Sequence, residues 1–184
     1  MPGPAFDPSG AVRFDLSSGS TSDPRGTRLV LLPAAALEAL DRTTPGALSF
    51  LASELGRACG TRVAANLGGD ANVRGAELEV VVTHLAGELA IAGLGAVSVE
   101  RWGKALVFVV SNPSVASDAF VSAALAGAVQ AATNREVAVG VCGKDGPTTR
   151  YFVGSQATVM KIRGLVSQGK SAGDVLAAVQ KVNA

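Results

Sequence analysis

The sequence is short of the residues from which metal centres and disulfide frameworks are built. Its 184 residues include two cysteines, Cys59 and Cys142, and one histidine, His84. Two cysteines do not make a disulfide scaffold, and a structural zinc site takes about four nitrogen or sulfur ligands. Such a site would have to be completed by carboxylates, so we predict that the protein holds no metal and no cofactor.

Charge is also scarce. Only 17% of the residues are charged, the formal net charge is +1, and no block of lysine or arginine forms a basic stripe. This composition excludes the usual nucleic-acid-binding surface. No uncharged apolar run reaches the length of about 18 residues that a membrane span needs, and the N-terminus lacks the pattern of a signal peptide. We therefore expect a cytoplasmic protein that neither binds nucleic acid nor spans a membrane.

What the sequence does contain is a large share of small apolar residues. Hydrophobic residues make up 48% of the chain and aromatic residues only 4%. A chain of this length can bury a real core within one domain, which we assign to residues 11–184 after a loose Pro- and Gly-rich tail at 1–10. Low net charge combined with many apolar residues favours self-association, so we expect a homodimer.

The N-terminal part is predicted to form two strands and a helix. Apolar and charged residues alternate over 12–16, which is strand periodicity. The stretch 17–26 is rich in turn-forming residues and predicts a loop, and 29–32 is expected to form a second strand. Pro33 suits the first turn of a helix.

Two amphipathic helices follow. Thr44-Pro45 is expected to open the first, with Thr44 as its cap. Gly56 and Gly60 lie one turn apart in this helix. Because a glycine costs about 1 kcal/mol in a helix interior, the pair indicates that another backbone approaches closely there. A stripe of apolar residues over 78–89 predicts the second helix.

From Gly95 onward the chain is predicted to form a hairpin, a small-residue helix, a second hairpin and further helices. The nearly all-apolar run 105–110 is typical of a central strand or one covered on both faces. Ser117 can cap an alanine-rich helix from Asp118 to about Ala132. The second hairpin is expected over 137–153, and Ser155 and Ser171 are expected to cap the two helices after it.

Three stretches of the sequence resemble the 4-vinyl reductase domain, the bacterial and archaeal relative of the small subunits of the TRAPP vesicle-tethering complex. The first is Leu55-Gly56-Arg57-Ala58-Cys59-Gly60, and the second is Arg101-Trp102-Gly103 with the Val-rich strand behind it. The third is Cys142, Gly146 and Phe152, in a pattern where the family has a second cysteine and this chain has Arg150. The replacement argues against a metal or thiol-pair role.

The resemblance implies an α/β (α+β) fold in which helices pack on one face of a twisted, mainly antiparallel sheet, often as a dimer. It also implies an apolar cavity between the helices and the sheet. We predict that the cavity is lined by residues of the helices and of the central strand, namely Gly56, Cys59, Gly60, Leu85, Leu89, Phe108 and Phe120. The smooth alanine helix is the predicted dimer seam, at Ala123, Ala124, Gly127, Ala128 and Ala131.

Three functions remain open at this point. The first, which we favour, is a non-enzymatic dimeric module that binds a small hydrophobic ligand such as a lipid or hydrocarbon. The second is a TRAPP-like scaffold for a protein partner such as a small GTPase. The third is a reductase subunit, which lacks support because we find no nucleotide fingerprint, metal set or catalytic triad.

The remaining single residues receive structural interpretations. Cys142 is interpreted as a small residue at a strand end, and Cys59 as a buried apolar side chain rather than an acyl-carrying cysteine of the vesicle-tethering kind. His84 lies off the main stripe of its helix, so we expect it at the surface or half-buried. No catalytic residue is predicted.

Overall fold

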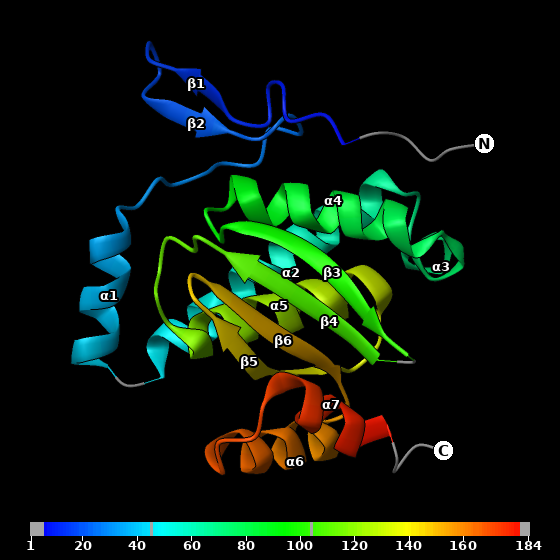
Figure 1. The fold of residues 1–184 in the computed structure, drawn as a ribbon. Coiled ribbons are helices and arrows are strands. Elements are labelled where there is room, and N and C mark those ends of the chain that lie inside the picture. Colours follow the sequence, from blue (N-terminus) through cyan, green and yellow to red (C-terminus); the bar gives the residue numbers. More distant parts are fainter. Residues whose placement is uncertain (1–5, 45, 104, 181–184) are drawn as a thin grey trace.

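A four-stranded antiparallel sheet forms the centre of the computed structural model, which describes residues 6–44, 46–103 and 105–180 (Figure 1). Its strand order is β3-β4-β6-β5. The strands are β3 (Ala96–Trp102), β4 (Ala105–Ser111), β5 (Ala138–Asp145) and β6 (Thr148–Gly154). Both predicted hairpins are present, and the predicted fold class, an antiparallel sheet with helices packed on it, is confirmed.

The sheet buries both of its faces. Phe108 of β4 pairs in register with Tyr151 of β6, and both side chains belong to the larger core. Their chain neighbours Val107 and Phe152 also pair, and they belong to a second core on the opposite face. Successive residues of a strand point to opposite faces, so an apolar run such as Ala105–Ser111 is buried on both sides, as its composition predicts.

Helices α4 (Leu78–Ile91) and α5 (Asp118–Thr133) contribute to the core on the first face, and α2 (Ala47–Asn66) packs against both. Figure 1 shows α2 and α5 behind the sheet, with α4 along its β3 side. The short helix α3 (Asp70–Gly75) connects α2 to α4, and α1 (Ala34–Thr43) rests on α2. The expected helix caps are present on α5, where the Ser117 hydroxyl accepts from the Phe120 N–H.

The second face is covered by α6 (Gln156–Ser167) and α7 (Ala172–Gln180), through Val159, Ile162 and Val175. The expectation that helices lie on one face only is therefore wrong. The reason is local, because Cys142 and Phe152 present apolar surface on this face that α6 and α7 shield from water. Both helices begin at the predicted caps, since Ser155 and Ser171 accept hydrogen bonds from the backbone N–H groups of Thr158 and Asp174.

The N-terminal hairpin differs from its prediction. Its strands are β1 (Arg13–Asp15) and β2 (Ser20–Ser22), so the second strand falls within the stretch predicted as a loop. The turn is stabilised by the Asp15 carboxylate, which accepts from the backbone N–H groups of Ser17 and Ser18. The stretch 29–32 forms no strand, so that prediction is wrong.

The junction between α1 and α2 also differs. Thr44 ends α1, donating its N–H to the Leu40 carbonyl, and Gly46 precedes the first residue of α2. The prediction that Thr44 caps α2 is therefore wrong, and Pro45 lies outside the described residues. Of the predicted tail, residues 1–5 also lie outside them, and Phe6 packs edge-on against His84 with ring centroids 5.8 Å apart.

Helix length and polarity bear on the membrane question. The longest described helix, α2, has 20 residues and carries Glu54, Arg57 and Arg62 along its length. Across the part of the chain that the structure describes, no helix is long and apolar enough to span a bilayer.

Glycines set the distance between α2 and α5. A methyl group on Gly56 or Gly60 would overlap the carbonyl oxygens of Ala124 and Ala128, and one on Gly127 would overlap the carbonyl of Ser53. The predicted close approach of a backbone at Gly56 and Gly60 is confirmed, although the partner is α5 and not the sheet.

We therefore expect Gly60→Ala to lower the free energy of unfolding by about 3 kcal/mol, because the helices must separate to admit the methyl group. The matched control is Gly164→Ala in α6, where a methyl group meets nothing within 4 Å. That substitution should raise the free energy of unfolding by roughly 0.5–1 kcal/mol, because alanine has a higher helix propensity than glycine. Urea unfolding followed by circular dichroism measures both. Equal effects of the two substitutions would contradict the close packing of α2 on α5.

Candidate functional site

A partly open cavity of about 680 Å³ lies between α2, α4 and the N-terminal arm, which we define as residues 6–33. The arm supplies one wall through residues 6–7, 11–12, 23–25 and 29–32. Helix α2 supplies the opposite wall, and the end of α4 and the start of α5 close it. The cavity is therefore built by segments far apart in the chain.

Most of the lining is apolar. The inner part of this apolar surface comes from four helices and consists of Leu37, Leu51, Leu55, Ile91, Ala92 and Phe120. The outer part is the arm segment 29–32, whose Val30 is 81% exposed and whose Leu31 is 63% exposed. Apolar side chains of this kind beside an open cavity leave surface that a ligand can cover.

One end of the cavity is charged. Arg62 of α2 donates from Nε to Glu88 Oε2 of α4 at 2.6 Å, and the two side chains are 23% and 9% exposed. Burial opposes the charge on Arg62, but the hydrogen bond to Glu88 and the neighbouring groups Cys59, Glu88 and Asp23 together raise the pKa of Arg62. Cys59 completes the cluster, since its Sγ lies 3.4 Å from Arg62 Nη2. The ion pair connects α2 to α4 at the cavity floor.

Two residues of the arm join this charged end. Asp23 is buried, and its Oδ1 accepts from the backbone N–H groups of Arg25 and Thr27 at 2.9 and 2.8 Å. Burial alone would raise the pKa of Asp23, but these hydrogen bonds and the nearby charge of Arg62 lower it overall. Arg25 reaches back to α2, where its Nη2 donates to Asn66 Oδ1. The arm is thus held to α2 by polar contacts as well as by apolar ones.

Of the seven predicted ligand-binding residues, Phe120 lines the cavity. The other six lie within the protein interior. Gly56 and Gly60 face α5, while Cys59, Leu85, Leu89 and Phe108 are 0–3% exposed in the larger core. Contact between those six residues and a ligand stays a prediction. The cavity described above is lined by other residues.

The predicted dimer seam lies partly against the same chain. Ala124, Gly127 and Ala128 are buried under α2, because their backbones are the ones that Gly56, Ser53 and Gly60 approach. Ala123 and Ala131 are half-buried. The smooth surface of α5 is therefore used for packing within the chain.

Sequence reasoning missed the Arg62–Glu88 pair, although one signal for it existed. Glu88 follows Val81 and Leu85 on the buried stripe of α4, at helical spacings of seven and three residues. A carboxylate on an apolar stripe needs a buried partner. His84 shares this stripe and is only 4% exposed, so the expectation of a surface or half-buried histidine is wrong.

Arg150 of β6 forms an ion pair with Glu100 of β3 across the sheet. Its guanidinium donates to both Glu100 carboxylate oxygens at 3.2 and 3.3 Å, and Trp102 Nε1 donates to the same carboxylate at 2.7 Å. The hydrogen bonds from Arg150 and then Trp102 lower the pKa of Glu100. Cys142 is fully buried beside this pair, with Sγ 3.4 Å from the Arg150 carbonyl. A guanidinium therefore occupies the position where the family pattern has a second cysteine.

Metal-ligand geometry is absent from the described part of the chain, in which no three His, Cys, Asp or Glu side chains come together in a group able to hold an ion. Cys59 and Cys142 are both buried free thiols. Burial raises the pKa of each thiol to about 11. Neither is therefore ionised near neutral pH.

We expect both cysteines to resist alkylation in the native protein. At about pH 8 iodoacetamide should label each at least about 100-fold more slowly than in urea, because the thiolate is the reacting form and is scarce at a raised pKa. Mass spectrometry of peptides against time measures this. Rapid labelling of either cysteine without urea would contradict the interpretation of both as buried, unreactive thiols.

Comparison with known proteins finds a likeness among solved structures but none in sequence. No family model and no curated protein matches the sequence. Among solved structures, the chain is similar to the phenol-responsive sensory domain of the transcription activator PoxR, solved with phenol. The match has a TM-score of 0.59 at 17% identity and covers 86% of this chain and 92% of that domain. At this identity the likeness shows the fold: the chain shares the architecture of that sensory domain along nearly its whole length.

Proposed function

We propose that the protein is a non-enzymatic module that binds a small, mainly apolar ligand in the cavity between α2, α4 and the N-terminal arm, and that it serves as a sensor of that ligand. One observation carries the proposal: a cavity of about 680 Å³ has an apolar wall and a single charged end. Binding sites for small molecules have typical volumes of about 300–1,000 Å³ and combine apolar walls with a few convergent polar groups.

The chemistry of the lining favours binding over catalysis. Its described residues include no serine, cysteine, threonine, lysine or histidine that could act as nucleophile. Its buried carboxylates are already engaged, Glu88 with Arg62 and Asp23 with backbone N–H groups. Groups held in this way orient a ligand readily but are poorly placed to attack it.

The fold gives independent support. The similar PoxR domain is described as phenol-responsive and sensory. This chain retains that architecture and carries the glycine pair and hairpin pattern that resemble the 4-vinyl reductase domain, so we place it as a distant relative of that family. The same likeness supports the proposal of a sensory role.

Filling the cavity should abolish binding. Ala58 lines the cavity from an exposed position on α2, so Ala58→Trp adds bulk to the space without intruding on the core. We expect the Kd of a neutral hydrophobic fluorophore, N-phenyl-1-naphthylamine, to rise at least about tenfold. Fluorescence titration of the purified protein measures it.

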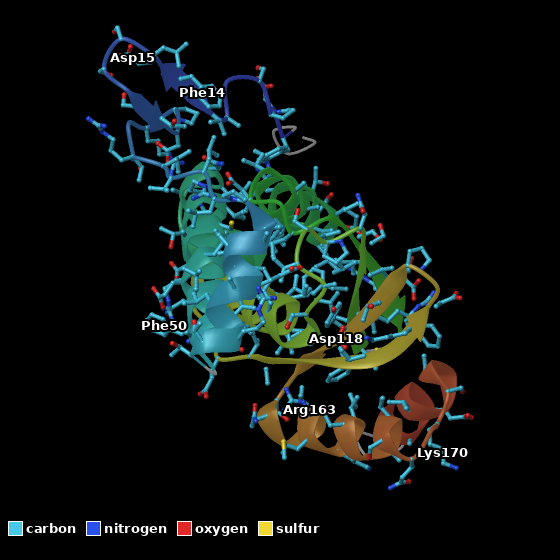
Figure 2. The ribbon with its side chains drawn as sticks, turned by 90° about the vertical axis from the view of Figure 1, so that its left-hand side faces the viewer. Phe14, Asp15, Phe50, Asp118, Arg163 and Lys170 are labelled. Atoms are coloured by element: carbon cyan, nitrogen blue, oxygen red, sulfur yellow. The ribbon has the colours of Figure 1, made fainter. Side chains whose placement is uncertain are left out.

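The control is Ala157→Trp, at an exposed position on α6. Helices α6 and α7 lie at the opposite end of the molecule from the hairpin in both views (Figures 1 and 2). This variant should bind the fluorophore as the unaltered protein does. Loss of binding in both variants, or in neither, would show that the fluorophore does not occupy the cavity.

We also infer that the protein forms a homodimer, through the β1–β2 hairpin. Figure 2 shows Phe14 on this hairpin, which projects from the body. Phe14 is 61% exposed and Leu16 is 90% exposed. A two-stranded hairpin is only marginally stable by itself, and apolar side chains exposed on it favour contact with a second copy of the chain. Light scattering after size exclusion should give a dimeric mass for the unaltered chain and a monomeric mass for Phe14→Asp/Leu16→Asp. A monomeric mass for the unaltered chain would refute the inference.

A further inference from the structure

Across its lining, the cavity carries more negative than positive groups. Its described lining contains three carboxylates, Asp7, Asp23 and Glu88, and two guanidinium groups, Arg25 and Arg62. The formal charge of the lining is therefore −1. A ligand head that enters the cavity therefore meets no excess of positive charge.

Of the two arginines, Arg62 has its charge matched by a carboxylate, whereas the exposed Arg25 hydrogen-bonds to a neutral amide. Arg62 is held by Glu88 at 2.6 Å and also lies near Asp23, while Arg25 donates to Asn66. A carboxylate head placed beside Arg62 would lose its water and gain no unmatched cation there, which is unfavourable in a partly buried site. An ammonium head would face the guanidinium groups of Arg62 and Arg25, and would have to compete for carboxylates that are already hydrogen-bonded.

We propose that the cavity selects ligands with a neutral hydrogen-bonding head, such as a hydroxyl group, over the corresponding carboxylates and amines, and that Glu88 sets this selectivity. The proposal rests on the proposed function, because it concerns the same cavity. A hydroxyl group can donate to a carboxylate oxygen and accept from a guanidinium N–H without disturbing the charge balance. Glu88 is the decisive group since it neutralises the one arginine that is largely buried at the cavity floor.

Competition against bound N-phenyl-1-naphthylamine tests the selectivity with three ligands that share one alkyl chain. At neutral pH, 1-octanol should displace the fluorophore at concentrations at least about tenfold lower than octanoate or octylamine. Displacement by octanoate or octylamine at concentrations equal to or lower than that of 1-octanol overturns the proposal.

The variant Glu88→Gln separates the charge effect from the greater hydrophobicity of the alcohol. It keeps the shape of the side chain but removes the carboxylate that pairs with Arg62, so the affinity for octanoate should rise about tenfold relative to the affinity for 1-octanol. The control Glu54→Gln removes a carboxylate that pairs with Arg57 on the exposed side of α2, outside the cavity lining. This control should change the affinity for neither octanoate nor 1-octanol. An unchanged affinity of folded Glu88→Gln for octanoate relative to 1-octanol overturns the role of Glu88.

The outcomes also separate this proposal from the one on which it rests. If the unaltered protein binds no fluorophore, the proposed function fails; if it binds fluorophore and both charged ligands displace it as well as 1-octanol does, only the selectivity fails. Circular dichroism checks the folding of Glu88→Gln. Should that variant be unfolded, Asp23→Asn removes the other buried carboxylate of the cavity and should strengthen octanoate binding in the same direction; no gain there overturns the charge-balance argument.

Discussion

Helices α2 and α5 lie so close together that three of their residues must be glycine. With a methyl group at Gly56, Gly60 or Gly127, backbone carbonyl groups of the facing helix would be overlapped. This contact fixes α2 rigidly against the core and thereby decides what its other faces do. One face, with Ala52, Cys59 and Val63, is buried in the larger core. A neighbouring face, which includes Leu55, Ala58 and Arg62, is left turned toward the N-terminal arm and becomes the wall of the cavity.

The cavity depends on a second constraint, the buried ion pair of Arg62 and Glu88. Breaking a buried pair by removing one partner is costly because the other charge is left without compensation. The pair therefore connects α2 to α4 and also neutralises the half-buried Arg62 in the cavity lining. A binding site with apolar walls and balanced charges recognises ligands mainly by shape and apolar area, with the head group as a filter.

Much of the fold could be predicted from the sequence, whereas the cavity could not. The glycine spacing at Gly56 and Gly60 and the cap at Ser117 have local causes, so they were predicted correctly in kind. The cavity wall at Leu29–Leu32 has no such cause: its apolar run predicts a strand, but its conformation is set by what lies across from it. The Arg62–Glu88 pair joins residues 26 positions apart, and nothing in either helix alone identifies its partner. Leu85 and Phe108, whose apolar character predicts that they face inward, belong to the larger core, and their contact with a ligand stays a prediction.

The central claim is that a small neutral ligand enters the space between α2, α4 and the arm. Methyl nuclear magnetic resonance of the protein during titration with 1-octanol tests it most directly, because each labelled methyl group reports its own surroundings. The account predicts saturable shifts at Leu37, Leu55 and Ile91, which line the cavity, and none at Leu165 or Val166, which pack on the opposite face of the sheet. Shifts confined to α6 and α7, or the absence of saturable shifts at the cavity methyl groups, would contradict it.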